Sequence, residues 1–128
     1  MEIKAQKILS SVKEKPYFSE GNFVLYYSDC LPILEQLPDS SIDMIFADPP
    51  YNLSNGGFSV HAGRRVSVNK GEWDKSKGMA ADLEFYEEWL RLCYALLKPN
   101  GTIWVCGTYH NIYMVGYVMQ LVGYHILN

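Results

Sequence analysis

Apolar residues along the chain form short segments whose spacing alternates between that of strands and that of helices. Runs of β-branched and aromatic residues predict strands at residues 23–27, 42–47, 102–106 and 124–127. Apolar residues three and four positions apart predict helices at residues 31–37, 83–97 and 114–122. This alternation predicts an α/β fold with a mostly parallel sheet and helices on its faces.

Two acidic residues follow predicted strands, at the ends where such sheets bind ligands. Residues 42–47 are mostly apolar, which is typical of a buried parallel strand, and Asp48 comes directly after them. Asp29 occupies the equivalent place after residues 23–27. Because open α/β sheets bind ligands beyond the carboxyl ends of their strands, the sequence predicts a site near both carboxylates. Asp29 can equally be the N-cap of the helix that follows it.

The tetrapeptide Asp48-Pro49-Pro50-Tyr51 is suited to holding a neutral amine. Prolines fix φ and lack an N–H, so the Asp48 carboxylate and the Pro49 carbonyl are held as acceptors without competing donors. Hydrogen bonds to both hydrogens of an aromatic amine favour a pyramidal nitrogen and direct its lone pair at an electrophile such as a sulfonium methyl. Tyr51 offers a flat face for a base that has left its stack. The alternative is a rigid turn that happens to contain an acid.

A long segment at residues 52–79, rich in Gly, Ser, Asn and Lys, follows the tetrapeptide. Connections of this length in compact domains are usually functional or disordered. Between residues 52 and 78, five basic residues outnumber two acidic ones, a local net charge of +3 in a chain whose net charge is −3. A basic loop on an acidic body fits contact with a phosphate backbone, although charged loops are often only solvated.

The run from Asp43 to Asn52 resembles motif IV of the DNA adenine-N6 and cytosine-N4 methyltransferases. Flanking segments resemble the permuted β-class of that family, and some are similar to members of Dpn-type restriction systems, which act on GATC. These segments are residues 27–31, 53–57, 66–71, 71–75 and 97–105. The resemblance implies an S-adenosylmethionine-dependent methyltransferase fold of the Rossmann-like kind. Within it, residues 1–22 would be an N-terminal arm and residues 23–128 a partial catalytic domain.

The resemblance also implies roles for individual residues. Asp48 and Pro49 would hold the target amine, Pro50 would complete the rigid turn and Tyr51 would stack on the base, which makes all four candidate catalytic residues. S-adenosylmethionine would be the cofactor, contacted by Asp29, Cys30 and Asp48. An Asp at the first motif position is typical of enzymes that act on DNA amines and is commoner in adenine than in cytosine enzymes. We therefore expect methylation of adenine N6.

DNA is the partner that the resemblance implies, bound in part by the basic segment. The candidate DNA-binding residues are Asn55, Arg64, Arg65, Lys70 and Trp73. Trp73 can order this segment around DNA or simply anchor it. An RNA guanine or protein glutamine methyltransferase is the alternative, but such enzymes mostly carry Asn at the position of Asp48 or another aromatic residue at that of Tyr51.

One feature of the family is missing from the sequence. The cofactor loop of these enzymes resembles F-x-G-x-G, and the ten glycines here include no pair two positions apart. The target-recognition region is missing as well. We therefore expect an incomplete fold with unpaired strand edges, in which residues 1–128 alone neither fold stably nor methylate. The chain would be a truncated form, an inactive fragment, or a subunit completed by the missing C-terminal part or by a second subunit.

Composition argues against several other classes of protein. Cys30, Cys93 and Cys106 contain no C-x-x-C pair and the three histidines are not spaced as a cluster, so we expect no metal site and no disulfide, only buried thiols. No apolar run approaches the roughly 20 residues of a membrane span, and the first residues lack the layout of a secretory signal. A cytoplasmic protein without a membrane partner is expected.

Overall fold

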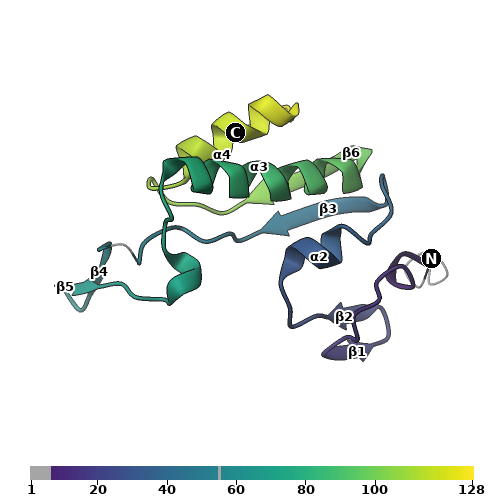
Figure 1. Ribbon diagram of the computed structural model, residues 1–128, viewed down its shortest axis with the longest axis horizontal. Helices are drawn as coiled ribbons and strands as arrows, with labels where there is room; N and C mark the ends of the chain where they lie inside the picture. The colour runs from purple at the N-terminus through teal and green to yellow at the C-terminus, as the bar shows by residue number, and fades with distance from the viewer. Residues whose placement is uncertain (1–6, 55) are drawn as a thin grey trace. The chain divides into compact units, whose positions relative to one another are not determined.

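The computed structural model describes residues 7–54 and 56–128, in which short strands alternate with helices (Figure 1). The strands are β1 (Phe18–Glu20), β2 (Phe23–Leu25), β3 (Ile42–Ala47), β4 (Phe58–His61), β5 (Arg64–Ser67) and β6 (Leu97–Val105). The helices are α2 (Cys30–Leu34), the 3-10 helix η1 (Glu72–Asp74), α3 (Met79–Leu96) and α4 (Ile112–Val122). The predicted α/β class is confirmed.

The chain divides into two compact units, each described here by itself. One comprises Met1–Ile45 and Arg91–Thr102, and the other comprises Phe46–Leu90 and Ile103–Asn128. No helix in the described parts of the chain is long and apolar enough to cross a membrane.

In the first unit, the strand predicted at residues 23–27 is shorter than expected and does not join the parallel sheet. β2 pairs antiparallel with β1, with Phe18 opposite Leu25 and Glu20 opposite Phe23. Gly21 adopts a φ of +55°, which a two-residue hairpin turn favours and which glycine reaches without steric cost. The chain reverses direction tightly at this point, which places residues 18–20 beside β2 as its partner strand. The predicted boundary between residues 22 and 23 falls at the end of this turn.

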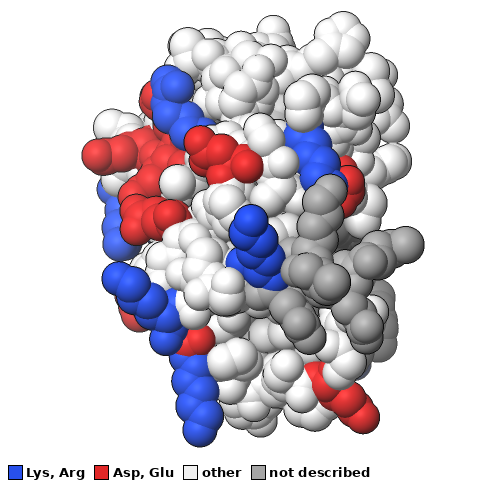
Figure 2. Space-filling model, turned by 90° about the vertical axis from the view of Figure 1, so that its right-hand side faces the viewer, with Lys and Arg blue, Asp and Glu red and all other residues white. Residues whose placement is uncertain are grey.

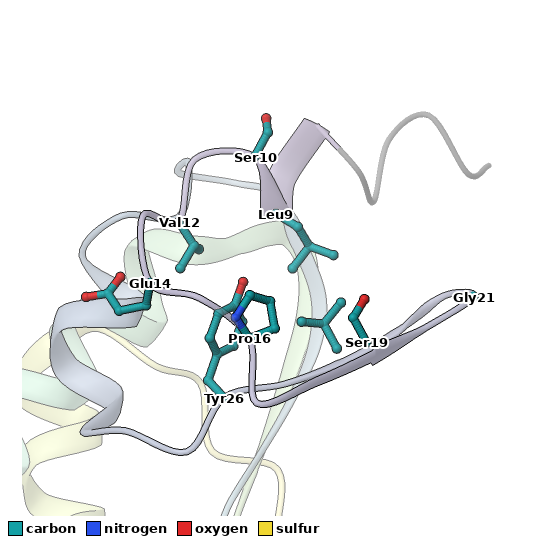
Figure 3. Close-up of a pocket in the computed structure, with 9 residues that line it drawn as sticks. Leu9, Ser10, Val12, Glu14, Pro16, Ser19, Gly21 and Tyr26 are labelled. Carbon is teal, nitrogen blue, oxygen red and sulfur yellow. The ribbon is translucent and has the colours of Figure 1, made fainter.

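A short capped helix follows the hairpin in the same unit. The Asp29 side chain is the N-cap of α2 and accepts a hydrogen bond from Leu31 N at 3.0 Å. Beyond the helix, Gln36 donates through Nε2 to Glu14 and accepts through Oε1 from Lys13 N. These bonds fix residues 13–14 beside the end of α2. A hollow between residues 9–16 and the hairpin is lined mainly by aliphatic and ring side chains (Figure 3), and it contains none of the predicted site residues.

β3 and β6 form a two-stranded parallel sheet, as predicted. Ser41 N donates to Leu96 O at 2.9 Å near one end of β3, and Cys106 N donates to Ala47 O at 2.8 Å at the other. The prediction that β3 is a buried strand is wrong for the described residues, because Met44 and Phe46 are 59% and 67% exposed.

The amphipathic faces predicted for the two long helices are confirmed. The buried residues of α3 are Tyr86, Trp89, Leu90, Cys93 and Leu96, and those of α4 are Val115 and Val118. α3 begins at Met79, so that Asp82 lies in its first turn. Its carboxylate reaches back to accept from Lys77 N at 3.2 Å.

Three other sequence predictions need correction. The strand predicted at residues 102–106 begins earlier, because β6 starts at Leu97 directly after α3 and includes Pro99, which is exposed. Residues 52–79 are not a featureless loop, because β4, β5 and η1 form there. Residues 124–127 form no strand, since Tyr124 N is used by the C-terminal bonds of α4 and donates to Met119 O.

Candidate active site

The Asp48-Pro49-Pro50-Tyr51 turn begins where the β3–β6 ladder ends. Ala47 O accepts the last ladder bond from Cys106 N at 2.8 Å, and the two prolines that follow Asp48 cannot donate further ones. The chain therefore leaves the sheet at this point. Asp48 is exposed and Pro49 is half-buried, so the carboxylate faces solvent rather than a packed core.

The side chain of Tyr51 already engages this carboxylate. Its hydroxyl donates a hydrogen bond to Asp48 Oδ1. That bond is the main reason why the pKa of Tyr51 rises to about 12, since the neutral phenol is the donor; partial burial and the negative charge of Asp48 act in the same direction. Lys70 Nζ lies 5.2 Å from the centroid of the Tyr51 ring. An acidic acceptor, an aromatic face and a cation thus meet at one turn.

A buried carboxylate that sequence reasoning missed supports the backbone of this turn. Asp74 is fully buried, and its Oδ1 accepts from Tyr51 N at 3.0 Å and from Asn52 N at 3.1 Å. Its Oδ2 accepts from the Ser54 hydroxyl at 2.8 Å. The signal was present in the sequence, because Asp74 lies within residues 71–75, a segment that resembles the family, although no role was assigned to its carboxylate.

Further polar side chains hold the turn from the side of the helices. Pro50 O accepts from Asn111 Nδ2 at 3.3 Å and from the Tyr86 hydroxyl at 3.4 Å. Asn52, whose φ is +58°, donates through Nδ2 to Asp82 at 3.2 Å and to the Tyr86 hydroxyl at 3.1 Å. Tyr86 and Asn111 are both buried, so these bonds lie in a low-dielectric interior where unmade bonds are costly.

Comparison with known proteins then identifies the family. A family model described as DNA methylase matches residues 42–128, which is more than half of the chain. The chain belongs to this DNA methylase family. The match begins at β3 and therefore includes the whole turn, its buried supports and the β4–β5 hairpin.

Three curated relatives extend the similarity toward the N-terminus. They are the Type II methyltransferases M2.LlaDCHI of Lactococcus lactis subsp. cremoris, 47% identical over 128 residues, M2.DpnII of Streptococcus pneumoniae, 48% identical over 114, and M2.MboI of Moraxella bovis, 48% identical over 116. The matches cover 100%, 89% and 89% of this chain but 48%, 42% and 42% of those relatives. The chain spans less than half the length of these relatives.

Both arginines predicted to bind DNA lie together on an exposed hairpin. β4 and β5 pair antiparallel, with His61 opposite Arg64 and Val60 opposite Arg65. Every residue of both strands is exposed, and the Arg65 guanidinium lies 3.8 Å from the centroid of the Phe58 ring. The hairpin therefore presents two cations to solvent on a short, regular scaffold.

The remaining predicted DNA-binding residues are placed differently. Lys70 lies beside Tyr51, and its backbone N donates to the Ser54 hydroxyl at 2.8 Å, so the structure brings this residue to the Asp48-Pro49-Pro50-Tyr51 turn. Trp73 is 63% exposed, although it directly precedes the buried Asp74. Asn55 lies outside the described residues.

The predicted cofactor residues Asp29 and Cys30 belong to the first unit, whereas Asp48 belongs to the second. Asp29 is exposed and uses one oxygen as the helix cap. Cys30 is exposed rather than buried as expected, because it is the first residue of a five-residue helix that buries none of its residues. Partial desolvation, followed by the charge of Asp29, raises the pKa of the Cys30 thiol and keeps it neutral. The other two thiols differ, since Cys93 is buried and Cys106 half-buried.

Charge on the surface of this protein is mixed. On the face drawn in Figure 2, Lys and Arg side chains alternate with Asp and Glu and do not form a broad basic patch. The described residues also contain no group of three His, Cys, Asp or Glu side chains arranged to hold a metal ion. The residues that gather for chemistry are those around Asp48 and Tyr51.

Proposed function

We propose that this chain carries the catalytic turn of a DNA methyltransferase that transfers a methyl group to an exocyclic base amine, adenine N6 in particular. The observation that carries the proposal is the exposed Asp48 carboxylate beside the ring of Tyr51, in a turn whose backbone is fixed from behind by Asp74. Family membership and the relatives' printed names support methyl transfer. The parallel β3–β6 pair is compatible with a Rossmann-like methyltransferase sheet.

The residues present divide the work between holding the amine and holding the ring. Asp48 and the carbonyl of Pro49 accept hydrogen bonds from the two amine hydrogens, which orients the nitrogen lone pair. The ring of Tyr51 stacks against the extruded base. In the structure, the Tyr51 hydroxyl donates to the Asp48 carboxylate. The entering amine therefore replaces the hydroxyl as the donor to Asp48, and the phenol turns away. After transfer, the nitrogen carries one extra proton, which Asp48 is placed to accept and pass to solvent.

This chain supplies only part of a binding site for S-adenosylmethionine. Asp29 offers an exposed carboxylate that can accept from an adenine amine, and the backbone N–H of Cys30 can meet the ring. When bound, this compound supplies the electrophilic methyl group. The chain contains no pair of glycines two positions apart for close approach to the rest of the molecule. We infer that another segment, in the same reading frame or in a second subunit, completes the cofactor site.

DNA is the proposed macromolecular substrate, contacted through Arg64, Arg65 and Lys70. The two arginines are exposed on the hairpin and Lys70 lies beside the stacking ring, an arrangement that serves phosphates flanking an extruded base. Trp73, being exposed, is proposed to contact DNA rather than to anchor the segment. An RNA or protein amine methyltransferase is less well supported, since the matching family model is described as DNA methylase, although the exposed arginines would serve RNA as well as DNA.

The test is transfer of labelled methyl groups from S-adenosylmethionine to unmethylated DNA, RNA and protein, using protein expressed from its natural reading frame. We expect label in DNA alone, recovered as N6-methyladenine after digestion to nucleosides. Recovery as N4-methylcytosine would correct the base, whereas label only in RNA or protein would contradict the proposal. The incomplete-site inference is tested separately with purified residues 1–128, which we expect not to bind S-adenosylmethionine; binding in the micromolar range would refute it.

A further inference from the structure

We propose that Asp74 is a positioning residue for methyl transfer, which sets the backbone of Tyr51 and so the plane on which the target base stacks. The inference rests on the proposed function, because it assigns to Asp74 the support of a stacking ring. A positioning role differs from a purely structural role because it predicts a loss in kcat without a comparable change in the affinity for S-adenosylmethionine.

The contacts of Asp74 converge on one short stretch of backbone. One oxygen accepts from two successive N–H groups, those of Tyr51 and Asn52, and the other accepts from Ser54. Burying a carboxylate completely is unfavourable unless hydrogen bonds replace the lost water, and here they come from the residues that follow the two prolines. The burial of this carboxylate is therefore favourable only when the backbone adopts this turn and presents these donors.

Fixing the backbone of Tyr51 has a definite consequence for its side chain. With N–H and chain direction set by Asp74, the ring can move only by rotation about its side-chain torsions. One orientation places the hydroxyl on Asp48, as seen in the structure, and rotation frees the ring face for the base. Asp74 thereby leaves Tyr51 a choice between two side-chain positions while its backbone stays in place.

The same carboxylate joins the catalytic turn to the segment that reaches toward DNA. Asp74 ends η1, and Ser54 N donates to its carbonyl at 3.3 Å. The Ser54 hydroxyl, which donates to Asp74, accepts from Lys70 N. Lys70 is thus linked to the Asp74 carboxylate by two hydrogen bonds through the Ser54 hydroxyl, and Trp73 directly precedes Asp74. A contact between DNA and either residue would therefore lie close to the support of Tyr51.

Kinetic constants separate positioning from simple folding. Asp74→Ala removes the acceptor of both N–H groups, whereas Asp74→Asn keeps one oxygen for them and replaces the other by a donor. In protein expressed from its natural reading frame, we expect Asp74→Ala to lower kcat about 100-fold, the scale of a misplacement near 1 Å. Asp74→Asn should recover part of that loss. The Kd for S-adenosylmethionine should change less than about twofold, and Asp39→Ala, at an exposed position, is the matched control.

Hydrogen exchange of the same variants provides the second measurement. Amides 51 and 52 should exchange slowly in the wild type and much faster in Asp74→Ala, with α3 unchanged. Should kcat, cofactor affinity and exchange in α3 all deteriorate together, Asp74 is a folding residue and the proposal is overturned. Fast exchange of amides 51 and 52 in the wild type overturns it as well. If the wild type transfers no methyl group to DNA, the proposed function fails, and the exchange data alone then decide whether Asp74 fixes the turn.

Discussion

The Asp48-Pro49-Pro50-Tyr51 turn and the β4–β5 hairpin belong to the same unit of the protein but are built in opposite ways. Backbone atoms of the turn are bound by three buried side chains, Asp74, Tyr86 and Asn111. In the hairpin, every side chain is exposed, and the two strands pair only with each other. Figure 1 shows the hairpin as a ribbon of two short strands, β4 and β5.

The contrast separates two requirements of a base-modifying enzyme. Chemistry on an amine needs acceptors fixed to within fractions of an ångström, which buried hydrogen bonds provide. Contact with a phosphate backbone needs charge near a surface and tolerates adjustable side chains. We therefore expect changes in the turn to affect the rate of transfer and changes in the hairpin to affect the affinity for DNA.

Removing the carboxylate of Asp48 should have the largest effect. Asp48→Ala deletes one of the two acceptors proposed for the amine, and loss of a single preorganised hydrogen-bonding group costs about 100- to 1000-fold in kcat. Steady-state methylation of DNA by wild type and variant measures this, with Asp39→Ala as the exposed acidic control. A variant that kept most of its activity would place the chemistry elsewhere.

Loss of the ring of Tyr51 should rank second. Stacking of a base on an aromatic side chain contributes about 1–3 kcal/mol, so Tyr51→Ala should lower kcat/KM about 10- to 100-fold. Tyr51→Phe is the matched control, because it keeps the ring and loses only the bond from the hydroxyl to Asp48. Equal losses in both variants would show that the hydroxyl matters and that stacking does not.

Neutralising the hairpin should weaken binding without slowing transfer. Each phosphate contact contributes about 0.9 to the slope of log K against log salt, so the Arg64→Ala, Arg65→Ala double variant should reduce that slope by about 2. Its kcat at saturating DNA should equal that of the wild type. Lys7→Ala, an exposed change in the other unit, is the control. A slope that does not change would remove the hairpin from the DNA interface.

Ionisation of Tyr51 should give the smallest and most local signal. Its pKa is raised from 10.0 to about 12 because the neutral hydroxyl donates to Asp48. The bond is thus fully present below pH 10 and is lost as the pH rises through about 12. Comparison of ultraviolet titrations of wild type and Tyr51→Phe should show one tyrosine that remains un-ionised at pH 11. Ionisation of that tyrosine near pH 10 would mean that the bond to Asp48 does not form in solution.

The sequence predicted those elements whose pattern reflects local constraints. The buried faces of α3 and α4 follow from apolar spacing, and the position of the turn follows from the two prolines after Asp48, the first residue beyond β3. The predicted parallel neighbour of β3 is also present, as β6. The helix faces and the turn are determined by residues close in sequence, whereas the pairing of β3 with β6 was predicted from the alternation of strands and helices.

Features that depend on distant residues could not be predicted in this way. Asp74 reads as one more charge in a polar segment, and only the fold shows that it faces the N–H of Tyr51. Met44 and Phe46 are apolar, as a buried strand requires, yet burial also needs a covering element on their side of the sheet. The antiparallel partner of β2 comes from residues 18–20, a strand of only three residues in which Ser19 and Glu20 are polar, so the apolar pattern does not reveal it.

The central claim, that Asp48 holds the target amine, is tested most directly by a binding cycle between that side chain and that amine. Oligonucleotides carrying either adenine or purine, which lacks the exocyclic amine, at the methylated position are bound to the wild type and to Asp48→Ala. Because a hydrogen bond to a charged group contributes about 1.5–3 kcal/mol, the ratio of adenine to purine affinity should be at least about 10-fold larger in the wild type than in the variant. The same ratio in both proteins would contradict the account.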